Sequence, residues 1–229
     1  MDIDKAINKL VEFLDEPVFE TYRLWLDRIR SMPGANGLFE RIAVAADQET
    51  LCDYLAEALY ILVFTGLGFQ VEIEPYGKKG PDLKVSRDRN EAVVEITRFR
   101  TVHPGPPILN LSDVNAILSE YGNPARDIRK AIRKISKKFL QVGSEKSIIA
   151  IWNDDEDMEE LEVEAAVHDL RNEESLPDGL LFIVYGSKWI GRKQLHCFPF
   201  RHSIDPHYAL WQREFDSSIA SEVIQQALG

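Results

Sequence analysis

The chain has 229 residues, 45% of them hydrophobic, which is enough for one large domain with a substantial buried core. It contains no run of about 18 apolar residues, which excludes a membrane-spanning helix. The N-terminal sequence MDIDKAINKL has no apolar signal core, so we expect a cytoplasmic protein without a membrane partner. Neither of the two cysteines belongs to a CxxC zinc pattern.

The net charge of −11 argues against wholesale wrapping of nucleic acid. The charge is unevenly distributed along the chain. Residues 76–147 contain 15 Lys and Arg against 8 Asp and Glu, a balance of +7, whereas the remainder contains 12 against 30, a balance of −18. An acidic body with a basic middle favours one anion-facing surface, and ordinary scatter of surface charge is the alternative.

Residues 1–45 read as an N-terminal helical extension. Residues 3–14 and 16–31 each have the periodicity of an amphipathic helix, and the sequence MPGANG at 32–37 breaks the pattern. A strong helix is then predicted over 47–65. The glycines that follow it suit a helix cap rather than a phosphate-binding loop.

Residues 46–229 mix strand and helix patterns in the way typical of an α/β domain, with a mixed sheet flanked by helices. The residues 101–122 form a Pro/Gly-rich loop, after which Asn123 and Pro124 suit the start of a long helix. The predicted strands lie at 70–74, 82–86, 92–97, 147–152, 180–185 and 194–200, and the predicted helices at 124–142, 156–172 and 211–227.

Two acidic residues fall at matching positions of a predicted hairpin. The polar turn at residues 87–90 joins two strands, and a hairpin symmetric about its centre pairs residues whose numbers sum to 177. Asp82 then lies opposite Glu95, with Cβ atoms ~5 Å apart. Two like charges at that spacing are tolerated more readily with a cation between them. Oxygen ligands alone suit Mg²⁺ or Mn²⁺.

Glu57 is a third acid of interest because it is the only charged residue between Tyr54 and Val71. An ionised carboxylate among apolar helical neighbours is costly unless it is paired or bound to metal. The alternative is a structural glutamate at the helix edge or one bonded to a tyrosine hydroxyl.

These residues resemble the PD-(D/E)XK nuclease superfamily, whose fold is called restriction-endonuclease-like. The resemblance covers roughly residues 47–152, and its motif is short. It implies that Asp82 and Glu95 bind the metal, with the Ile96 carbonyl as a further ligand, and that Glu57 assists. Metal-bound water would then attack a phosphodiester of DNA or RNA. The matching segments are the helix with Glu57, Gly80-Pro81-Asp82, Val93-Val94-Glu95-Ile96-Thr97, the helix at 124–142 and the strand at 147–152.

The chain departs from the family at one catalytic position. The family usually has Lys two residues after the Glu, and here Thr97 takes that place. A hydroxyl can orient water but supplies no positive charge. Lys134 and Lys138, four residues apart on the basic helix, are candidates for a migrated lysine. The alternatives are a nuclease-fold module without catalysis that binds nucleic acid or a protein, and an unrelated α/β protein with incidental acids.

The helix at 124–142 is strongly basic. The functional interpretation is contact with nucleic-acid phosphates, and the alternative is a solvated face. Many nucleases of the family cut duplexes as dimers, which leaves a homodimer open. The expected phosphate contacts are Arg126, Lys130, Arg133, Lys134 and Lys137.

Overall fold

The computed structural model describes residues 3–77, 80–88, 90–100, 124–142, 146–154, 160–171, 179–187 and 195–199. Inside these ranges the side chains of 17, 124–128, 139–142, 160, 171, 187 and 195–199 are not described. The strands are β1 (Gln70–Ile73), β2 (Leu83–Arg87), β3 (Asn90–Phe99), β4 (Ser147–Asn153), β5 (Leu180–Ser187) and β6 (Leu195–Pro199). The helices are α1 (Ile3–Phe13), α2 (Glu16–Ile29), α3 (Ala35–Ala43), α4 (Gln48–Gly66), α6 (Pro124–Val142) and α7 (Glu160–Arg171).

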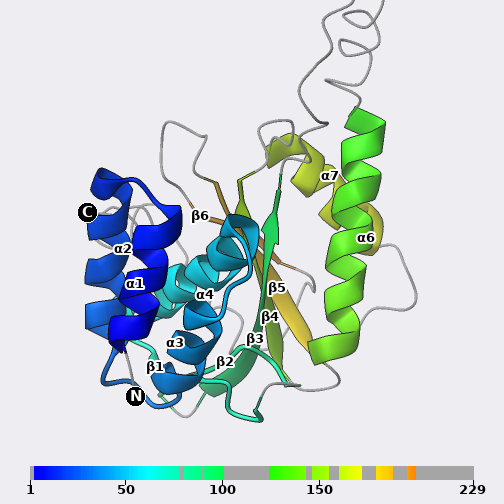
Figure 1. The fold of residues 1–229 in the computed structure, drawn as a ribbon. Helices are drawn as coiled ribbons and strands as arrows, with labels where there is room; N and C mark the ends of the chain where they lie inside the picture. Colours follow the sequence, from blue (N-terminus) through cyan, green and yellow to red (C-terminus); the bar gives the residue numbers. More distant parts are fainter. Residues whose placement is uncertain are drawn as a thin grey trace, which may run out of the picture.

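The described strands form one mixed sheet in chain order, β1-β2-β3-β4-β5-β6. Strands β1, β2 and β3 are antiparallel neighbours, β3, β4 and β5 run parallel, and β6 is antiparallel to β5. Helices α1 to α4 cover one face of the sheet, and α6 and α7 cover the other (Figure 1). The predicted α/β class, a mixed sheet flanked by helices, is therefore confirmed.

Alternating side chains of the central strands divide the core into two layers, as expected for a sheet buried on both faces. Ile148 and Ala150 of β4 belong to the larger cluster with α1 to α4. Ile149 and Ile151 belong to the cluster with α6 and α7. Residues of the expected N-terminal extension, such as Leu10, share the larger cluster with the sheet.

The sequence predicted two helices before residue 45, and this was incomplete because a third helix, α3, follows them. The expected break at 32–37 is shorter than predicted, since Gly34 already caps the new helix with a φ of 84°. A Cβ on Gly34 would lie 2.0 Å from the carbonyl oxygen of Ile73. Glycine is therefore required where α3 begins against β1. Leu38, Phe39 and Ile42 are buried and hold the short helix in place.

The predicted loop at 101–122 and the predicted helix at 211–227 lie outside the described residues. No described helix combines the length and apolar character needed to cross a bilayer.

Candidate active site

The two acids of the hairpin meet as predicted. Strands β2 and β3 pair with Leu83 opposite Val94 and Arg87 opposite Asn90, which is the predicted register. Asp82 directly precedes β2, so the same register places it opposite Glu95. The Asp82 carboxylate reaches the backbone of β3, where its Oδ2 accepts a hydrogen bond of 2.7 Å from the Ile96 N–H.

This contact arises because β3 extends beyond the start of β2. Alternate residues of β3 turn their backbone groups towards the side on which β2 lies, and past Val94 no β2 residue pairs with them. The Ile96 N–H therefore donates to the Asp82 carboxylate instead of to a backbone carbonyl of β2. Because the N–H and C=O of one strand residue point to the same side, the Ile96 carbonyl is directed towards Asp82 as well.

Glu95 is buried, with 1% of its surface exposed. Its Oε1 accepts a hydrogen bond of 2.6 Å from Lys138 Nζ, while its Oε2 is buried without a hydrogen-bond partner among the described residues. Burial and the nearby charge of Asp82 raise the pKa of Glu95 to about 7, against the opposing effect of Lys138. Burial also raises the pKa of Asp82, against the opposing effects of the Ile96 N–H, Lys138 and Arg41.

Glu57 is paired, and its partner is an arginine that the sequence did not suggest. Arg41 of α3 donates from Nη1 to Oε1 at 2.8 Å and from Nη2 to Oε2 at 2.6 Å. Burial and the charge of Asp82 nevertheless raise the pKa of Glu57 to about 8. The isolated charge of Glu57 signalled that a counter-ion was needed. Its identity depended on α3, which the sequence analysis missed.

Arg41 also reaches Glu74, directly after β1, where Nε lies 3.0 Å from Oε1. Four carboxylates therefore lie in one charge-coupled group, which we call the acidic centre: Glu57, Glu74, Asp82 and Glu95. Arg41 on one side and Lys138 on the other are the cations that contact it. With all six groups ionised, two negative charges are left uncompensated by the ion pairs of the described residues.

The lysine that approaches the acids is Lys138, not Lys134. Lys134 Nζ instead donates to the Arg98 carbonyl and lies over the Phe99 ring, 5.3 Å from its centroid. Burial, followed by the charges of neighbouring cations, lowers the pKa of Lys134 to about 8. Thr97 is 8% exposed, and alternation along β3 places it on the same face as Glu95.

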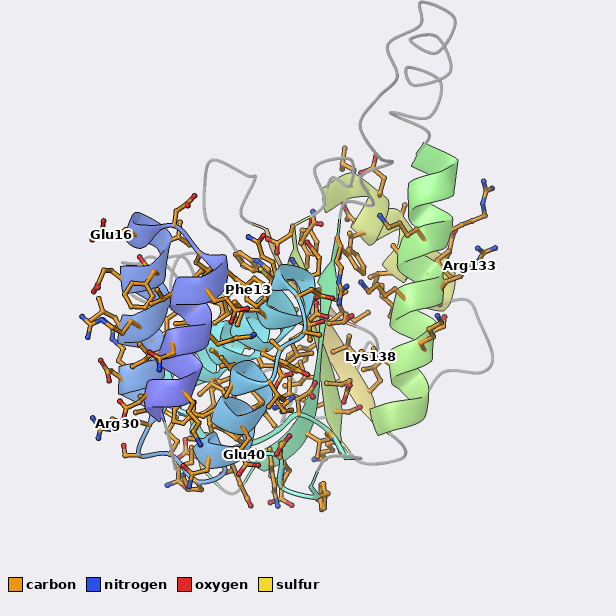
Figure 2. The ribbon with its side chains drawn as sticks, in the orientation of Figure 1. Phe13, Glu16, Arg30, Glu40, Arg133 and Lys138 are labelled. Atoms are coloured by element: carbon orange, nitrogen blue, oxygen red, sulfur yellow. The ribbon has the colours of Figure 1, made fainter. Side chains whose placement is uncertain are left out.

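The basic helix α6 carries two rows of cations with four-residue spacing. The inner row faces the sheet: Lys130 donates to the Arg100 carbonyl at 3.1 Å, and Lys134 and Lys138 make the contacts given above. The outer row is exposed, and Figure 2 shows Arg133 on the side of α6 away from the sheet and Lys138 on the near side. Of the expected phosphate contacts, the Arg126 side chain lies outside the described residues. The outer row is Arg129, Arg133 and Lys137.

Among the described residues, no group of three or more His, Cys, Asp and Glu side chains is arranged to hold a metal ion. A magnesium site does not need three, because Mg²⁺ keeps several waters and commonly uses one or two carboxylates together with substrate phosphates. Asp82, Glu95 and the Ile96 carbonyl fit such a site. Among the described residues, Oε2 of Glu95 is buried without a hydrogen-bond partner, which leaves it able to contact a cation.

Scans against protein-family models, curated proteins and solved structures found no match.

Proposed function

We propose that this protein is a metal-dependent nuclease of the PD-(D/E)XK type that hydrolyses phosphodiester bonds of DNA or RNA. The observation that carries the proposal is the meeting of Asp82, Glu95 and Lys138. The hydrogen bond from Lys138 to Glu95 brings an amine from α6 to the motif glutamate. This contact supports Lys138 as a migrated lysine that replaces the one the family usually has at the position of Thr97.

The uncompensated charge of the acidic centre supports a divalent cation as the cofactor. One Mg²⁺ or Mn²⁺ ion would balance these two excess negative charges. Without such an ion, the raised pKa values of Glu57 and Glu95 indicate that the centre holds protons near neutral pH. We infer that a metal would replace these protons, since ligand carboxylates must be ionised.

Each residue has a distinct role in this proposal. Asp82, Glu95 and the Ile96 carbonyl hold the metal, which would activate water and offset charge on the phosphate. Lys138 stabilises negative charge on the phosphoryl oxygens and keeps Glu95 in place. Glu57 has both oxygens engaged by Arg41, so it assists by adding negative charge beside Asp82 rather than as a ligand.

The outer row of α6 supports a polyanionic substrate. Arg129, Arg133 and Lys137 are exposed and repeat every ~6 Å along the helix axis. Cations in this position would attract nucleic acid that the acidic centre alone repels. The inner-row lysines Lys130 and Lys134, expected from the sequence to contact phosphate, instead fasten α6 to β3.

The test is cleavage of labelled single-stranded and duplex DNA and RNA by the full chain with Mg²⁺ or Mn²⁺. Asp82→Asn and Glu95→Gln are each expected to lower the rate about a hundredfold or more, because several kcal/mol of charge stabilisation are lost. Lys138→Met should cause a similar loss, whereas Lys9→Met, which removes a partly buried lysine of α1 paired with Glu12, should leave the rate unchanged. Activity that survives Asp82→Asn would reject the proposal.

A non-catalytic nucleic-acid-binding module is the second candidate. One observation favours it: Lys138 already neutralises Glu95, and the Ile96 N–H already occupies an oxygen of Asp82, so both acids have partners without a metal. Calorimetric titration separates the two candidates. Retained DNA or RNA binding with no uptake of Mn²⁺ would select the module over the nuclease.

A further inference from the structure

We propose that Arg41 is a positioning residue through which the N-terminal helices set the geometry of the metal-binding acids. The inference rests on the proposed function, because it concerns the same acidic centre. Arg41 belongs to α3, within the N-terminal residues that the sequence analysis treated as an extension. It makes no hydrogen bond to Asp82 or Glu95, so any effect of its contacts on their positions must pass through Glu57 and Glu74.

The first connection is directional because two nitrogens of one planar group donate to the same carboxylate, while the third approaches Glu74 as an ion pair. The two Nη atoms of Arg41 bind the two oxygens of Glu57, and Nε faces Glu74. A guanidinium fixes direction as well as charge when it is bidentate, which an ammonium cannot do. The group also lies over the ring of Tyr54, with its Cζ atom 5.0 Å from the ring centroid. Arg41 therefore locks α4 and the end of β1 to α3.

The second connection leads from Glu74 to the metal-binding side. The Glu74 backbone N–H donates to the Asp82 carbonyl at 2.8 Å. Glu74 itself has a φ of 49°, a left-handed conformation that a glutamate rarely adopts. The surrounding contacts must hold it there, and Arg41 supplies the one to its carboxylate. Glu74 thus links α3 to Asp82, because its side chain pairs with Arg41 and its backbone N–H bonds to the Asp82 carbonyl.

Charge compensation alone makes the opposite prediction, which allows a sharp test. Asp82 feels the positive charge of Arg41. Removing that charge should tighten cation binding if Arg41 only balances the acids. If Arg41 positions them, the same change should weaken cation binding, because partners behind metal ligands typically contribute 10- to 100-fold in affinity.

The experiment is titration of the full chain with Mn²⁺, followed by calorimetry or by the loss of the free-ion paramagnetic resonance signal. Arg41→Met should weaken Mn²⁺ binding about tenfold or more. Arg41→Lys keeps the positive charge but cannot form the two parallel hydrogen bonds of a guanidinium, so it should restore the affinity only in part. The control is Arg23→Met, which removes an exposed arginine paired with Glu20 and should leave the affinity unchanged.

Gly37→Ala provides a second variant that changes no charge and keeps Arg41. A Cβ at Gly37 would lie 2.4 Å from Oε2 of Glu74, so the carboxylate must move away. Alanine is also the better helix former, so α3 should persist even if Arg41→Met fails to fold. We expect Gly37→Ala to weaken Mn²⁺ binding severalfold in a protein with native circular dichroism.

The outcomes separate this inference from the proposed function. If the unaltered protein binds Mn²⁺ and the Arg41→Met or Gly37→Ala variant binds it as tightly or more tightly while folded, the positioning role is wrong and the metal site stands. If the unaltered protein takes up no Mn²⁺, both are overturned. Weaker binding in both variants, with unchanged binding in Arg23→Met, supports Arg41 as the positioning residue.

Discussion

Strand β3 carries two charged groups that differ in how well their charges are matched. At its middle lies the acidic centre, where Glu95 keeps an oxygen without a partner among the described residues. At its far end Arg98, only 4% exposed at its side chain, binds three acids from other elements. We call this second group the Arg98 cluster; it comprises Arg98, Arg100, Glu49, Asp53 and Asp154.

The guanidinium of Arg98 is extensively hydrogen-bonded within its cluster. Arg98 donates from Nε to Asp53 at 3.0 Å, from Nη1 to Asp154 at 2.7 Å and from Nη2 to the Glu49 carbonyl at 3.0 Å. Trp152 Nε1 donates to the other oxygen of Asp154 at 3.0 Å. A buried charge with this many partners is built for stability, whereas the excess charge of the acidic centre has a structural cost and points to a ligand.

The largest expected effect is therefore the loss of protein stability when Arg98 is replaced. Arg98→Met should lower the free energy of unfolding by about 3 kcal/mol or more, because it removes a buried guanidinium and leaves Asp154, 14% exposed, without its cation. Asp82→Asn should cost much less without metal, since an amide oxygen can still accept from the Ile96 N–H and one repelling charge is removed. Urea denaturation in EDTA measures both, with Arg23→Met as an exposed control expected within about 1 kcal/mol of the unaltered protein.

If Asp82→Asn lost as much stability as Arg98→Met, the two groups would not differ in role. The acidic centre would then be a structural ion cluster like the other.

A second expected effect is a decline in metal-free stability with rising pH. Glu57 and Glu95 ionise near pH 4.5 when unfolded, but their pKa values in the folded protein are about 8 and about 7. Between those values the folded state binds more protons than the unfolded state, so stability falls as pH rises from about 4.5 to 8. The melting temperature in EDTA should fall across this range, and saturating Mn²⁺ should remove most of the decline.

Glu95→Gln sharpens this prediction because it removes one of the two groups. The decline up to about pH 7 should become shallower, and the protection by Mn²⁺ should disappear. Glu91→Gln is the matched control, since Glu91 is an exposed acid of the same strand paired with Lys84. A pH profile that Glu95→Gln leaves unchanged would show that the carboxylate already ionises normally in the folded protein.

The same comparison shows how far the sequence could lead. The register of β2 and β3 was predictable because a tight polar turn joins the two strands, which fixes Asp82 opposite Glu95. Alternation along β3 also places Arg98 on the face opposite Glu95, and its contacts with α4 agree with this. Its three acidic partners could not be named, because they come from positions 45 or more residues away along the chain.

The choice between Lys134 and Lys138 also required the structure. Both lie on one side of α6, and only the docking of the helix shows which of them meets Glu95. Arg41 was missed for a related reason: α3 has nine residues, and tertiary packing rather than a strong local signal holds so short a helix.

The smallest expected effect separates the two rows of α6. Arg133→Gln removes an exposed cation, so it should weaken binding of a DNA duplex a few-fold and lower the salt slope of log K by ~1. Lys130→Gln removes an inner-row cation that is bonded to the Arg100 carbonyl. It should lower the melting temperature while leaving the salt slope close to that of the unaltered protein. Fluorescence anisotropy of a labelled duplex across a salt series measures both slopes. Equal reductions would mean that the inner row contacts phosphate as well, and that α6 moves away from β3 when nucleic acid binds.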